Sequence, residues 1–307
     1  MKIASLNLST QKGVIKVPVE RVTVDLQGIV GDAHAGPWHR QVSILSTDSI
    51  AKFSKQLGRN IRYGEFAENI TIEGLDGTRV GVLDRFFSNG VVLEVTQLGK
   101  SCHGDGCSIF REVGNCVMPK EGIFCRVIQG GELFTGDKVD FQPKVFKILV
   151  ITLSDRCYAG IGEDRSGPLV RNQLSELMES HKRKYSIETG ILPDEPMQVA
   201  KRISSAFHEG YDIIVTTGST GIGPRDIAPE AIRPLLDREI PGIMDMIRLK
   251  YGMEKPNALI SRAFAGTKNK SLFFAIPGSP KAVIEYMEEI KKIIFHCFNM
   301  LYSIDNH

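Results

Sequence analysis

The spacing of hydrophobic residues changes near residue 143 and divides the chain into two differently patterned halves. Up to about residue 141, apolar and polar positions nearly alternate in short stretches, as at Val22 and Val24, which is typical of β-strands. Gly, Asn and Asp separate these stretches, and Asn89-Gly90 between two apolar runs indicates a tight hairpin. Many short strands with tight turns predict that residues 1–142 form a mainly antiparallel β-barrel.

One helix is predicted in this first half, over Thr47–Leu57. Thr47 is placed to cap its N-terminus. Ile50 and Phe53 fall on one side of the helix, which we expect to face inward.

From Lys147 onward, apolar strand-like runs alternate with amphipathic helical stretches. The predicted strands are Ile148–Leu153, Ser186–Leu192, Tyr211–Thr216 and Leu272–Ile276. Helical spacing relates two sets of apolar residues: Val199, Ile203, Ala206 and Phe207, and Val283, Met287, Ile290, Ile294, Phe298 and Leu301. Alternating strands and helices predict a three-layer α/β domain over residues 145–307, with a mostly parallel sheet and right-handed crossovers.

The composition is that of an ordinary soluble protein, with 307 residues, 42% hydrophobic and 24% charged. A formal charge of +2, from 38 basic and 36 acidic residues, gives no global field that attracts nucleic acid or an anionic membrane. No apolar stretch approaches the roughly 20 residues that span a bilayer, and Met1–Asn7 lacks the apolar core of a signal peptide. We therefore expect a cytoplasmic protein with reduced cysteines and no nucleic-acid or membrane partner.

The most informative stretch is the loop Thr216–Asp226, which follows the third predicted strand. It is rich in Gly, Ser and Thr and leads into a helix start at Pro229, so its N–H groups are free to hold phosphate oxygens. It is not a P-loop, because no Lys follows the glycines, and it does not match GxGxxG. It ends in Arg225-Asp226, a cation suited to phosphate and a carboxylate suited to Mg²⁺. A tight turn without a ligand is the alternative.

Polar or Gly-rich loops also follow the other three predicted strands. They begin at Ser154, Pro193 and Pro277. In a parallel sheet, ligands bind beyond the carboxyl ends of the strands, so four such loops predict one shared cleft. Helix capping is the alternative for individual residues, because Ser166 and Asp194 each stand at the start of a predicted helix.

Six ordered blocks in this second half resemble the molybdopterin-binding family, which includes bacterial molybdopterin adenylyltransferases and the matching domain of gephyrin. The blocks are Leu153–Arg156, Glu163–Gly167, Leu192–Glu195, Thr216–Glu230, Asp237–Gly242 and Pro277–Lys281. The resemblance implies that the terminal phosphate of molybdopterin attacks the α-phosphate of ATP, with Mg²⁺, giving adenylylated molybdopterin and pyrophosphate. It also implies a homo-oligomer, a trimer or a multiple of one.

The same resemblance assigns residues to the reaction. The family's two functional aspartates correspond to Asp194 and Asp226, expected to orient the triphosphate or hold Mg²⁺. The expected substrate-binding residues are Ser154, Asp155, Asp164, Ser166, Gly167, Thr217, Gly218, Ser219, Thr220, Gly221, Arg225, Pro277, Gly278 and Ser279. This set agrees with phosphoryl chemistry, which needs positioning and charge neutralisation more than a covalent nucleophile.

Ser219 departs from the family pattern, which usually has glycine at this position. If the position requires a positive φ, Ser219 costs about 1 kcal/mol or more, or the loop has another shape. The departure keeps a second function open, that of a non-catalytic protein that stores or delivers molybdopterin or the finished cofactor.

The first half resembles the MOSC domain, a β-barrel module named after molybdenum cofactor sulfurases. The matching blocks are Gly31–Gly36, Arg40–Ser43, Gly64–Asn69, Leu93–Cys102 and Gly136-Asp137. The resemblance assigns to Cys102 the role of carrying sulfur or ligating molybdenum, and it implies a molybdenum or tungsten cofactor at this domain. Since no desulfurase domain fits in the chain, a separate sulfur donor is an expected partner, with a molybdoenzyme client as the alternative.

Other interpretations of the cysteines and histidines remain open. A metal or iron–sulfur site would draw on Cys102, His103, Cys107, Cys116 and Cys125, although their spacings contain no CxxC pair. Burial is the alternative, above all for Cys125 and Cys297, which lie in apolar runs. His34 and His39, near Asp32 and Trp38, either contact an oxyanion or metal or are loop histidines held by hydrogen bonds.

Overall fold

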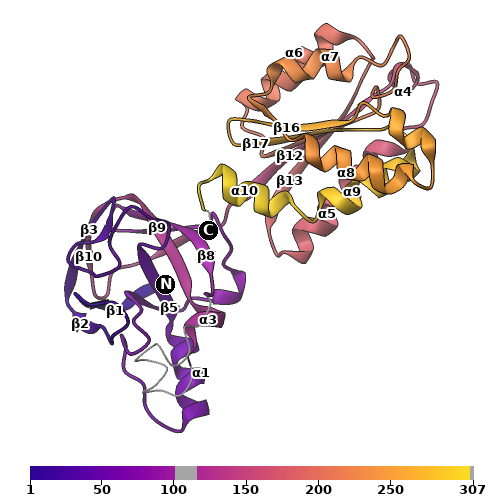
Figure 1. Cartoon of the computed structure of the whole chain (residues 1–307). Helices are drawn as coiled ribbons and strands as arrows, with labels where there is room; N and C mark the ends of the chain where they lie inside the picture. The colour runs from indigo at the N-terminus through magenta and orange to yellow at the C-terminus, as the bar shows by residue number, and fades with distance from the viewer. Residues whose placement is uncertain (101–115, 305–307) are drawn as a thin grey trace. The chain divides into compact units, whose positions relative to one another are not determined.

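The computed structural model describes residues 1–100 and 116–304. The chain divides into two compact units, Met1–Lys144 and Val145–Asp305, both drawn in Figure 1. Cys102, His103 and Cys107 lie outside the described residues. The role expected of Cys102 and the cysteine-based metal site therefore stay predictions.

The N-terminal unit is built mainly of strands. They are β1 (Lys2–Leu8), β2 (Val17–Val19), β3 (Arg21–Asp25), β4 (Gly28–Ile29), β5 (Val42–Ser46), β6 (Ile70–Glu73), β7 (Arg85–Ser88), β8 (Val91–Leu98), β9 (Ile123–Gln129), β10 (Gly131–Phe134) and β11 (Asp140–Gln142). They form an eight-stranded sheet in the order β11-β7-β8-β9-β5-β6-β1-β2 and a three-stranded sheet in the order β10-β3-β4. Within the described residues only the β5–β6 pair is parallel. The mainly antiparallel arrangement is confirmed, and closure into a barrel stays a prediction.

The sequence pattern of this unit corresponds to burial. In β3, Val22 and Val24 are 5% and 3% exposed, while the polar residues that alternate with them, Arg21, Thr23 and Asp25, are exposed. Asn89 and Gly90 join β7 to β8 with φ values of +46° and +81°. Two consecutive left-handed residues are what a type I′ hairpin turn requires, so the predicted hairpin is confirmed.

Helix α1 has the predicted bounds, Thr47–Leu57, and buries Ile50 and Phe53. Its N-cap, however, is Ser46, whose hydroxyl accepts a hydrogen bond from the N–H of Ser49 at 3.0 Å. The prediction of Thr47 as the cap was wrong by one residue. Ser46 still has the extended backbone of β5, which runs directly into the helix. The described part of the unit also has two short helical segments, α3 (Met118–Glu121) and η1 (Gly77–Arg79).

The C-terminal unit alternates strands and helices, as predicted. Its strands are β12 (Val145–Leu153), β13 (Lys184–Leu192), β14 (Ile213–Thr217), β15 (Arg238–Glu239), β16 (Phe264–Lys268) and β17 (Ser271–Ile276). Its helices are α4 (Asp155–Tyr158), α5 (Ser166–Ser180), α6 (Pro196–His208), α7 (Ala228–Ile232), η3 (Arg233–Leu235), α8 (Pro241–Gly252), η4 (Pro256–Ile260), α9 (Pro280–Ile290) and α10 (Ile294–Leu301). In the sheet order β13-β12-β14-β17-β16-β15, the first three pairs are parallel and the last two antiparallel. The sheet is thus mostly parallel, with an antiparallel edge.

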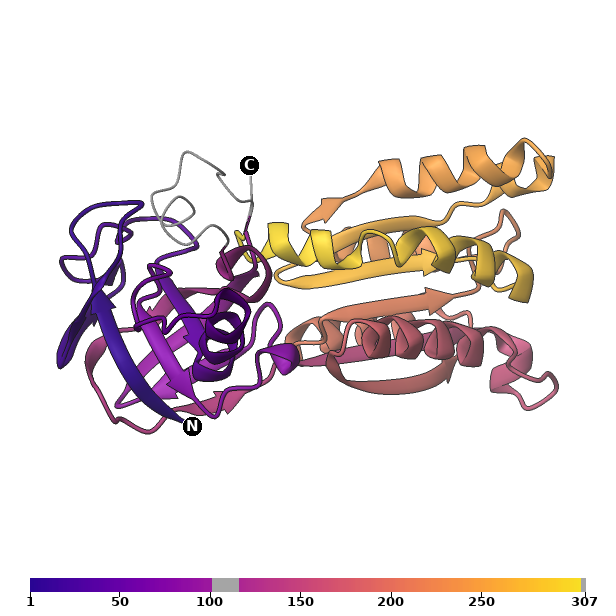
Figure 2. The same ribbon diagram turned by 90° about the horizontal axis from the view of Figure 1, so that it is seen from below.

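Helices cover both faces of this sheet, which gives three layers (Figures 1 and 2). Helices α6 and α7 lie on one face, and α5 and α9 lie on the other. Because side chains alternate along a strand, Leu149, Ile151 and Leu153 of β12 pack in one cluster with Val199 and Ile203 of α6. The helical stripe predicted for α6 is therefore confirmed as a core face.

The four parallel strands end at the same edge of the sheet. Leu153 at the end of β12 is paired with Leu192 at the end of β13. Thr217 at the end of β14 is paired with Ile276 at the end of β17. The polar loops that follow these strands consequently leave from one edge, which is where parallel sheets bind ligands.

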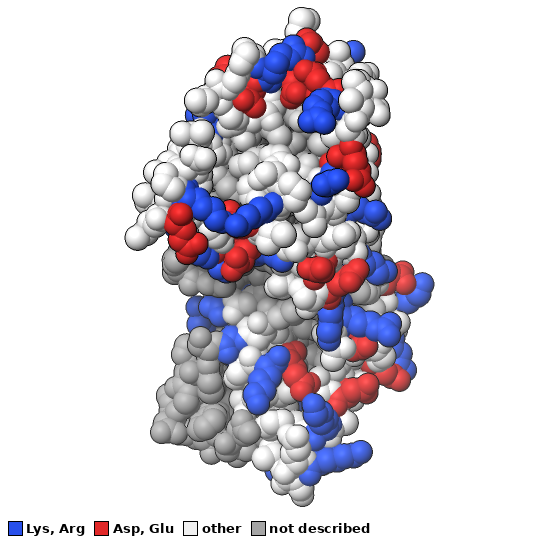
Figure 3. Space-filling model, turned by 90° about the vertical axis from the view of Figure 1, so that its right-hand side faces the viewer, with Lys and Arg blue, Asp and Glu red and all other residues white. Residues whose placement is uncertain are grey.

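The surface carries charges of both signs. On the face shown in Figure 3, Lys and Arg side chains lie among Asp and Glu, and an area of the C-terminal unit without charged side chains is bordered by both. This mixture agrees with the small net charge of +2. Among residues 1–100 and 116–304, no helix has the length and apolar character needed to cross a membrane.

Candidate active site

The loop after β14 begins with a close approach of three backbone segments at Gly218. Gly218 has a φ of +103°, and its N–H donates to the carbonyl of Ile276 at 2.9 Å. A Cβ at this position would lie 2.3 Å from the carbonyl oxygen of Leu153 and so would displace the backbone. Gly278, in the loop after β17, approaches less closely, since its own Cβ would lie 3.1 Å from the Gly218 Cα. Glycine at 218 therefore lets the three strand ends meet.

Ser219 has a φ of +55°, so this position does require the left-handed backbone conformation. In a residue other than glycine that conformation costs about 1 kcal/mol or more. Its side chain is fully used: the hydroxyl oxygen accepts from the N–H of Ile227 at 2.8 Å, and the O–H donates to the carbonyl of Arg225 at 3.1 Å. The carbonyl of Ser219 accepts from the N–H of Ala228 at 3.1 Å. One residue thus fastens the start of the loop to its end.

Arg262, just before β16, holds the same loop through its carbonyl groups. Its Nε donates to Gly221 at 2.6 Å and its Nη2 to Asp226 at 2.5 Å. Its backbone N–H donates to the carbonyl of Thr220 at 2.8 Å. The guanidinium also forms an ion pair with Glu230. Sequence reasoning missed Arg262, which stands far from the Gly-rich motif in the chain.

With these carbonyls held, the loop presents a series of unpaired donors. The backbone N–H groups of Ser219, Thr220, Gly221 and Ile222 have no hydrogen-bond acceptor within the described parts of the chain. We call these four groups the N–H cradle. Successive unpaired N–H groups in a turn suit a phosphate or another anion. The sequence predicted phosphate-binding N–H groups at residues 218–221, but the Gly218 N–H already donates to the Ile276 carbonyl of β17.

A pocket of about 450 Å³ opens beside the N–H cradle. Its volume is that of a small-molecule site. It is lined by predicted residues, namely Gly218, Ser219, Thr220, Gly221, Asp226, Pro277, Gly278 and Ser279. It is also lined by residues around η4 and α9 that sequence reasoning missed: Lys255, Asn257, Ser261, Lys281, Glu285 and Tyr286. The Pro277–Lys281 block was the only sequence signal for this second set.

Two lysines line the pocket, together with the carboxylates of Asp226 and Glu285. Lys255 Nζ lies 2.5 Å from Glu285 Oε1, and this hydrogen bond raises the pKa of Lys255. The neighbouring Lys255 ammonium lowers the pKa of Lys281. The Glu285 carboxylate already balances the Lys255 charge, which leaves Lys281 as the other cation of the pocket lining.

Arg225 lies in a separate cluster of charged groups. Its guanidinium donates to both carboxylate oxygens of Asp155 at 2.9 Å and to Glu195 at 3.0 Å. Asp155 and Asp194 are also linked, because the N–H of each donates to the carboxylate of the other, at 3.1 and 3.0 Å. These contacts bring together the loops after β12, β13 and β14. The expected contact of Arg225 with substrate phosphate stays a prediction, since protein carboxylates already balance its charge.

Asp194 is the carboxylate of this cluster with an unused oxygen. Its Oδ1 is buried and has no hydrogen-bond partner among the described residues. Burial raises the pKa of the Asp194 carboxyl, and the hydrogen bond from the Asp155 N–H partly offsets that rise. A buried polar atom without a partner usually serves a ligand, an ion or water. Asp226 differs, because its Oδ2 accepts from the N–H of Gly223 at 2.8 Å.

Several predicted substrate residues hold helix ends instead. Asp164 Oδ1 accepts from the N–H groups of Ser166 and Gly167 at 3.1 and 2.9 Å, and its Oδ2 accepts from Thr152 at 2.7 Å. The N-cap position of α5 is Arg165, and the carboxylate of Asp164, one residue earlier, does the capping. The alternative that Ser166 is the cap was wrong, because Ser166 is already helical. Substrate contact by Asp164, Ser166 and Gly167 stays a prediction. The alternative that Asp194 caps α6 was also wrong, since Glu195 is the N-cap and no side chain bonds there.

The hydroxyls at the other strand ends have local partners too. Ser154 accepts from the N–H of Cys157 at 3.3 Å and caps α4, and Ser279 accepts from the N–H of Ala282 at 3.3 Å and caps α9. Thr217 donates to the carbonyl of Pro277 at 3.0 Å. Each therefore has a structural role, and substrate contact by these residues stays a prediction.

A second group of polar residues surrounds Asp32 in the N-terminal unit. Lys16 and Asp32 form an ion pair at 2.6 Å, with side chains that are 1% and 0% exposed. His34 Nδ1 lies 3.3 Å from Asp32 Oδ1. Burial acts to raise the pKa of Asp32, but the hydrogen bond with His34 and the charge of Lys16 outweigh it and lower that pKa. The interpretation of His34 as a hydrogen-bonded loop residue is confirmed. The His39 backbone carbonyl accepts from Thr96, and the role of the His39 side chain stays a prediction.

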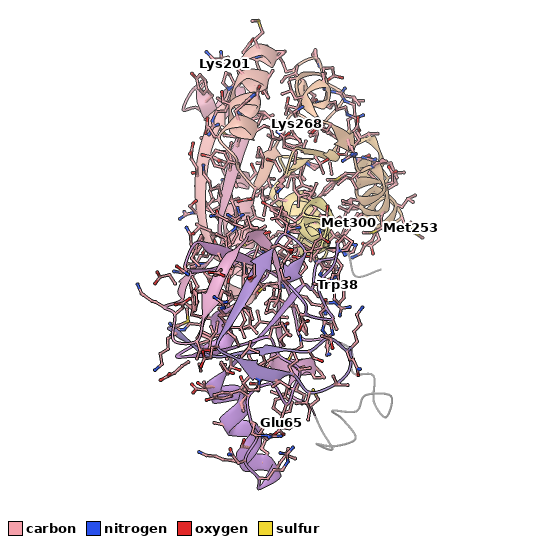
Figure 4. The ribbon with its side chains drawn as sticks, turned by 90° about the vertical axis from the view of Figure 1, so that its left-hand side faces the viewer. Trp38, Glu65, Lys201, Met253, Lys268 and Met300 are labelled. Carbon is pink, nitrogen blue, oxygen red and sulfur yellow. The ribbon has the colours of Figure 1, made fainter. Side chains whose placement is uncertain are left out.

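Trp38, labelled in Figure 4, lies in the loop between β4 and β5 and donates from Nε1 to the carbonyl of His34 at 2.7 Å. The Arg40 guanidinium and the Lys12 ammonium lie 4.9 and 5.8 Å from the centre of its ring. The buried Nε of Arg40 has no hydrogen-bond partner within the described residues. Two cations around one aromatic ring suit an anionic group of a ligand.

The cysteines that the structure describes offer no metal site. Cys125 in β9 is 0% exposed, and burial raises the pKa of its thiol. Cys297 is partly buried, which raises its pKa as well. Burial is thus confirmed for Cys125 and holds in part for Cys297. No group of three or more His, Cys, Asp or Glu side chains in residues 1–100 and 116–304 is arranged to hold a metal ion.

Comparison with known proteins decides the family. Residues 149–296 match the model of a probable molybdopterin binding domain, and residues 31–140 match the MOSC domain. A molybdopterin adenylyltransferase from Pyrococcus furiosus is 40% identical over 159 residues, which cover 50% of this chain and 90% of that protein. The chain belongs to the molybdopterin-binding family. It combines that domain with a MOSC domain, as the sequence predicted.

Two longer proteins share the molybdopterin-binding domain. Gephyrin from Dictyostelium discoideum is 38% identical over 160 residues, or 50% of this chain and 22% of that protein. A molybdenum cofactor biosynthesis bifunctional protein from Chlorobaculum tepidum is 34% identical over 172 residues, or 54% of this chain and 52% of that protein. The chain therefore spans about a fifth and about half of these two relatives.

The site fits the Mg²⁺ that the reaction of the molybdopterin-binding family implies. Mg²⁺ is usually held by one or two carboxylates together with phosphates and water. The unpaired Oδ1 of Asp194 is the oxygen that suits it. Asp226 has one carboxylate oxygen engaged in holding the loop.

Proposed function

We propose that the C-terminal unit adenylylates molybdopterin in molybdenum or tungsten cofactor biosynthesis, with ATP as the donor. A terminal phosphate oxygen of molybdopterin attacks the α-phosphorus of ATP, the bond to the β-phosphate breaks, and pyrophosphate leaves. The N–H cradle is the observation that carries the proposal. Four fixed donors beside a pocket at the carboxyl ends of a parallel sheet are suited to a phosphate group.

Each part of the site has a role in this proposal. The N–H cradle holds a substrate phosphate, and Lys281 brings positive charge to the same pocket. Asp194 holds Mg²⁺ through Oδ1, and that ion, when bound, neutralises charge on the triphosphate. Asp226 keeps the loop in shape through the Gly223 N–H. Phosphoryl-group transfer depends on such positioning and neutralisation.

The test is incubation of the purified protein with molybdopterin, ATP and Mg²⁺ while adenylylated product and pyrophosphate are followed. Asp194→Asn keeps the shape of the side chain and removes the charge, so we expect turnover to fall at least about a hundredfold with the fold intact. Asp226→Ala should also abolish adenylylation, because the loop loses its contact with Gly223. Full activity with both residues replaced would refute the site assignment.

A carrier of molybdopterin is the second candidate function. Ser219 replaces the glycine that is usual in the family, and a loop that still binds the substrate need not catalyse its reaction. Tight molybdopterin binding without any pyrophosphate release by the unchanged protein would establish that function instead. The N–H cradle is present in both cases, so turnover and not binding separates the two.

For the MOSC unit we propose binding of the cofactor or carriage of its sulfur, with Cys102 as the sulfur or molybdenum ligand. The cations around Trp38 support an anionic ligand such as the phosphate of the cofactor. A sulfur donor or a molybdoenzyme client is the partner, and the protein acts as a cytoplasmic homo-oligomer. Light scattering of the purified protein gives the oligomeric state directly.

A further inference from the structure

Ser219 holds the start of helix α7 through its hydroxyl and its carbonyl. The N–H of Ile227 has the Ser219 hydroxyl as its acceptor, and the Arg225 carbonyl receives the hydroxyl proton. Helix α7 begins at the next residue, Ala228, whose N–H is bonded to the Ser219 carbonyl. The first turn of α7 is therefore attached to Ser219 and not to a capping side chain of its own.

A glycine at 219 would keep the carbonyl bond to Ala228 and lose both bonds of the hydroxyl. The segment 223–227 would then be held by Arg262, by the Asp226 carboxylate and by the contacts of Arg225 with Asp155 and Glu195, none of which binds the Ile227 N–H. The N–H cradle, at 219–222, lies directly before this segment in the loop. The four N–H groups keep their relative positions only while the start of the loop at Ser219 is fixed to its end at 225–227. Phosphate binding needs donors that are held in position before the ligand arrives.

We propose that the Ser219 hydroxyl is the positioning group of the N–H cradle, so that phosphate binding by this protein depends on a side chain that glycine does not supply. The inference rests on the proposed function of the loop as a phosphate site. It concerns the residue that this chain has at 219. The two hydrogen bonds of the serine hydroxyl offset the free energy that its positive φ costs.

The experiment compares Ser219→Gly with Ser219→Thr. Glycine relieves the positive φ and removes the hydroxyl, whereas threonine keeps the hydroxyl and increases the backbone strain. We expect Ser219→Gly to melt at the same temperature or higher and to bind magnesium pyrophosphate about tenfold more weakly in calorimetry. We expect Ser219→Thr to melt lower and to bind within about threefold of the unchanged protein.

Ser303→Gly is the matched control, because Ser303 also has a positive φ, +53°, and lies outside the loop. It should raise the melting temperature and leave pyrophosphate binding unchanged. Hydrogen exchange gives a second readout, since the Ile227 amide should lose protection in Ser219→Gly and keep it in Ser303→Gly.

Two results would overturn the proposal. One is Ser219→Gly binding pyrophosphate as tightly as the unchanged protein, and the other is an unchanged protein that does not bind it at all. Failure of the adenylylation function is a separate outcome. If the unchanged protein binds pyrophosphate in a Ser219-dependent way and makes no adenylylated product, the positioning role stands and the enzymatic proposal falls.

Discussion

Gly218 and Ser219 are neighbours with the same kind of backbone, and they differ in what surrounds them. Both have positive φ values, +103° and +55°. A side chain at 218 would run into the carbonyl of Leu153, whereas the side chain at 219 has room and two hydrogen-bond partners. The backbone conformation alone therefore does not decide which of the two must be glycine.

Gly218→Ala is expected to disable the loop. The new Cβ would lie 2.3 Å from the Leu153 carbonyl, so the loop must shift away from β12, and adenylylation should fall at least about a hundredfold. Steady-state kinetics and thermal melting measure the two effects. Gly210→Ala is the control, because Gly210 has a φ of +72° and open space around its Cβ position. Equal activity of both variants would show that the close approach at 218 is not needed.

At the scale of elements, periodicity located the core elements and missed features that depend on contacts distant in the chain. The four parallel strands and α6 followed from apolar runs and helical spacing. Strand β15 has two residues and lies at the antiparallel edge, so no periodic pattern could show it. Arg262 and Lys255 enter the site from segments whose own sequence carries no motif, and only the folded chain places them beside the loop.

The sequence also does not determine which of two neighbouring residues caps a helix. Asp164 and Ser166 are both good capping residues, two positions apart, and composition alone does not choose between them. The structure gives the cap to Asp164, because the helix already includes Ser166.

Asp164→Ala separates that capping role from substrate binding. It removes hydrogen bonds to two N–H groups of α5 and to Thr152, so we expect the free energy of unfolding to fall by about 1–2 kcal/mol. Urea unfolding measures this change. If Asp164 only caps, the KM for ATP stays the same; a large rise in KM beyond that of the exposed neighbour variant Glu163→Ala would assign it to the substrate as well.

At the scale of the whole molecule, two compact units carry two chemically distinct groups of residues. The C-terminal unit holds the N–H cradle, the lysine pair and Asp194. The N-terminal unit holds the cations around Trp38, in a domain of the MOSC type. The described residues of each group belong to one unit, and the proposed functions assign a separate site to each.

Cys102→Ser in the full chain tests that arrangement. Serine keeps the size of the side chain and removes the thiolate, which is the form that carries sulfur or binds molybdenum. Because the residues proposed for adenylylation all belong to the C-terminal unit, the rate of adenylylated molybdopterin formation should stay within about twofold of the unchanged protein. Sulfur loading from a persulfide donor, or retention of the finished cofactor, should be lost, while Cys116→Ser, the matched control, keeps both activities. A parallel loss of adenylylation in Cys102→Ser would mean that the two units share one site, and the two-site model would then be wrong.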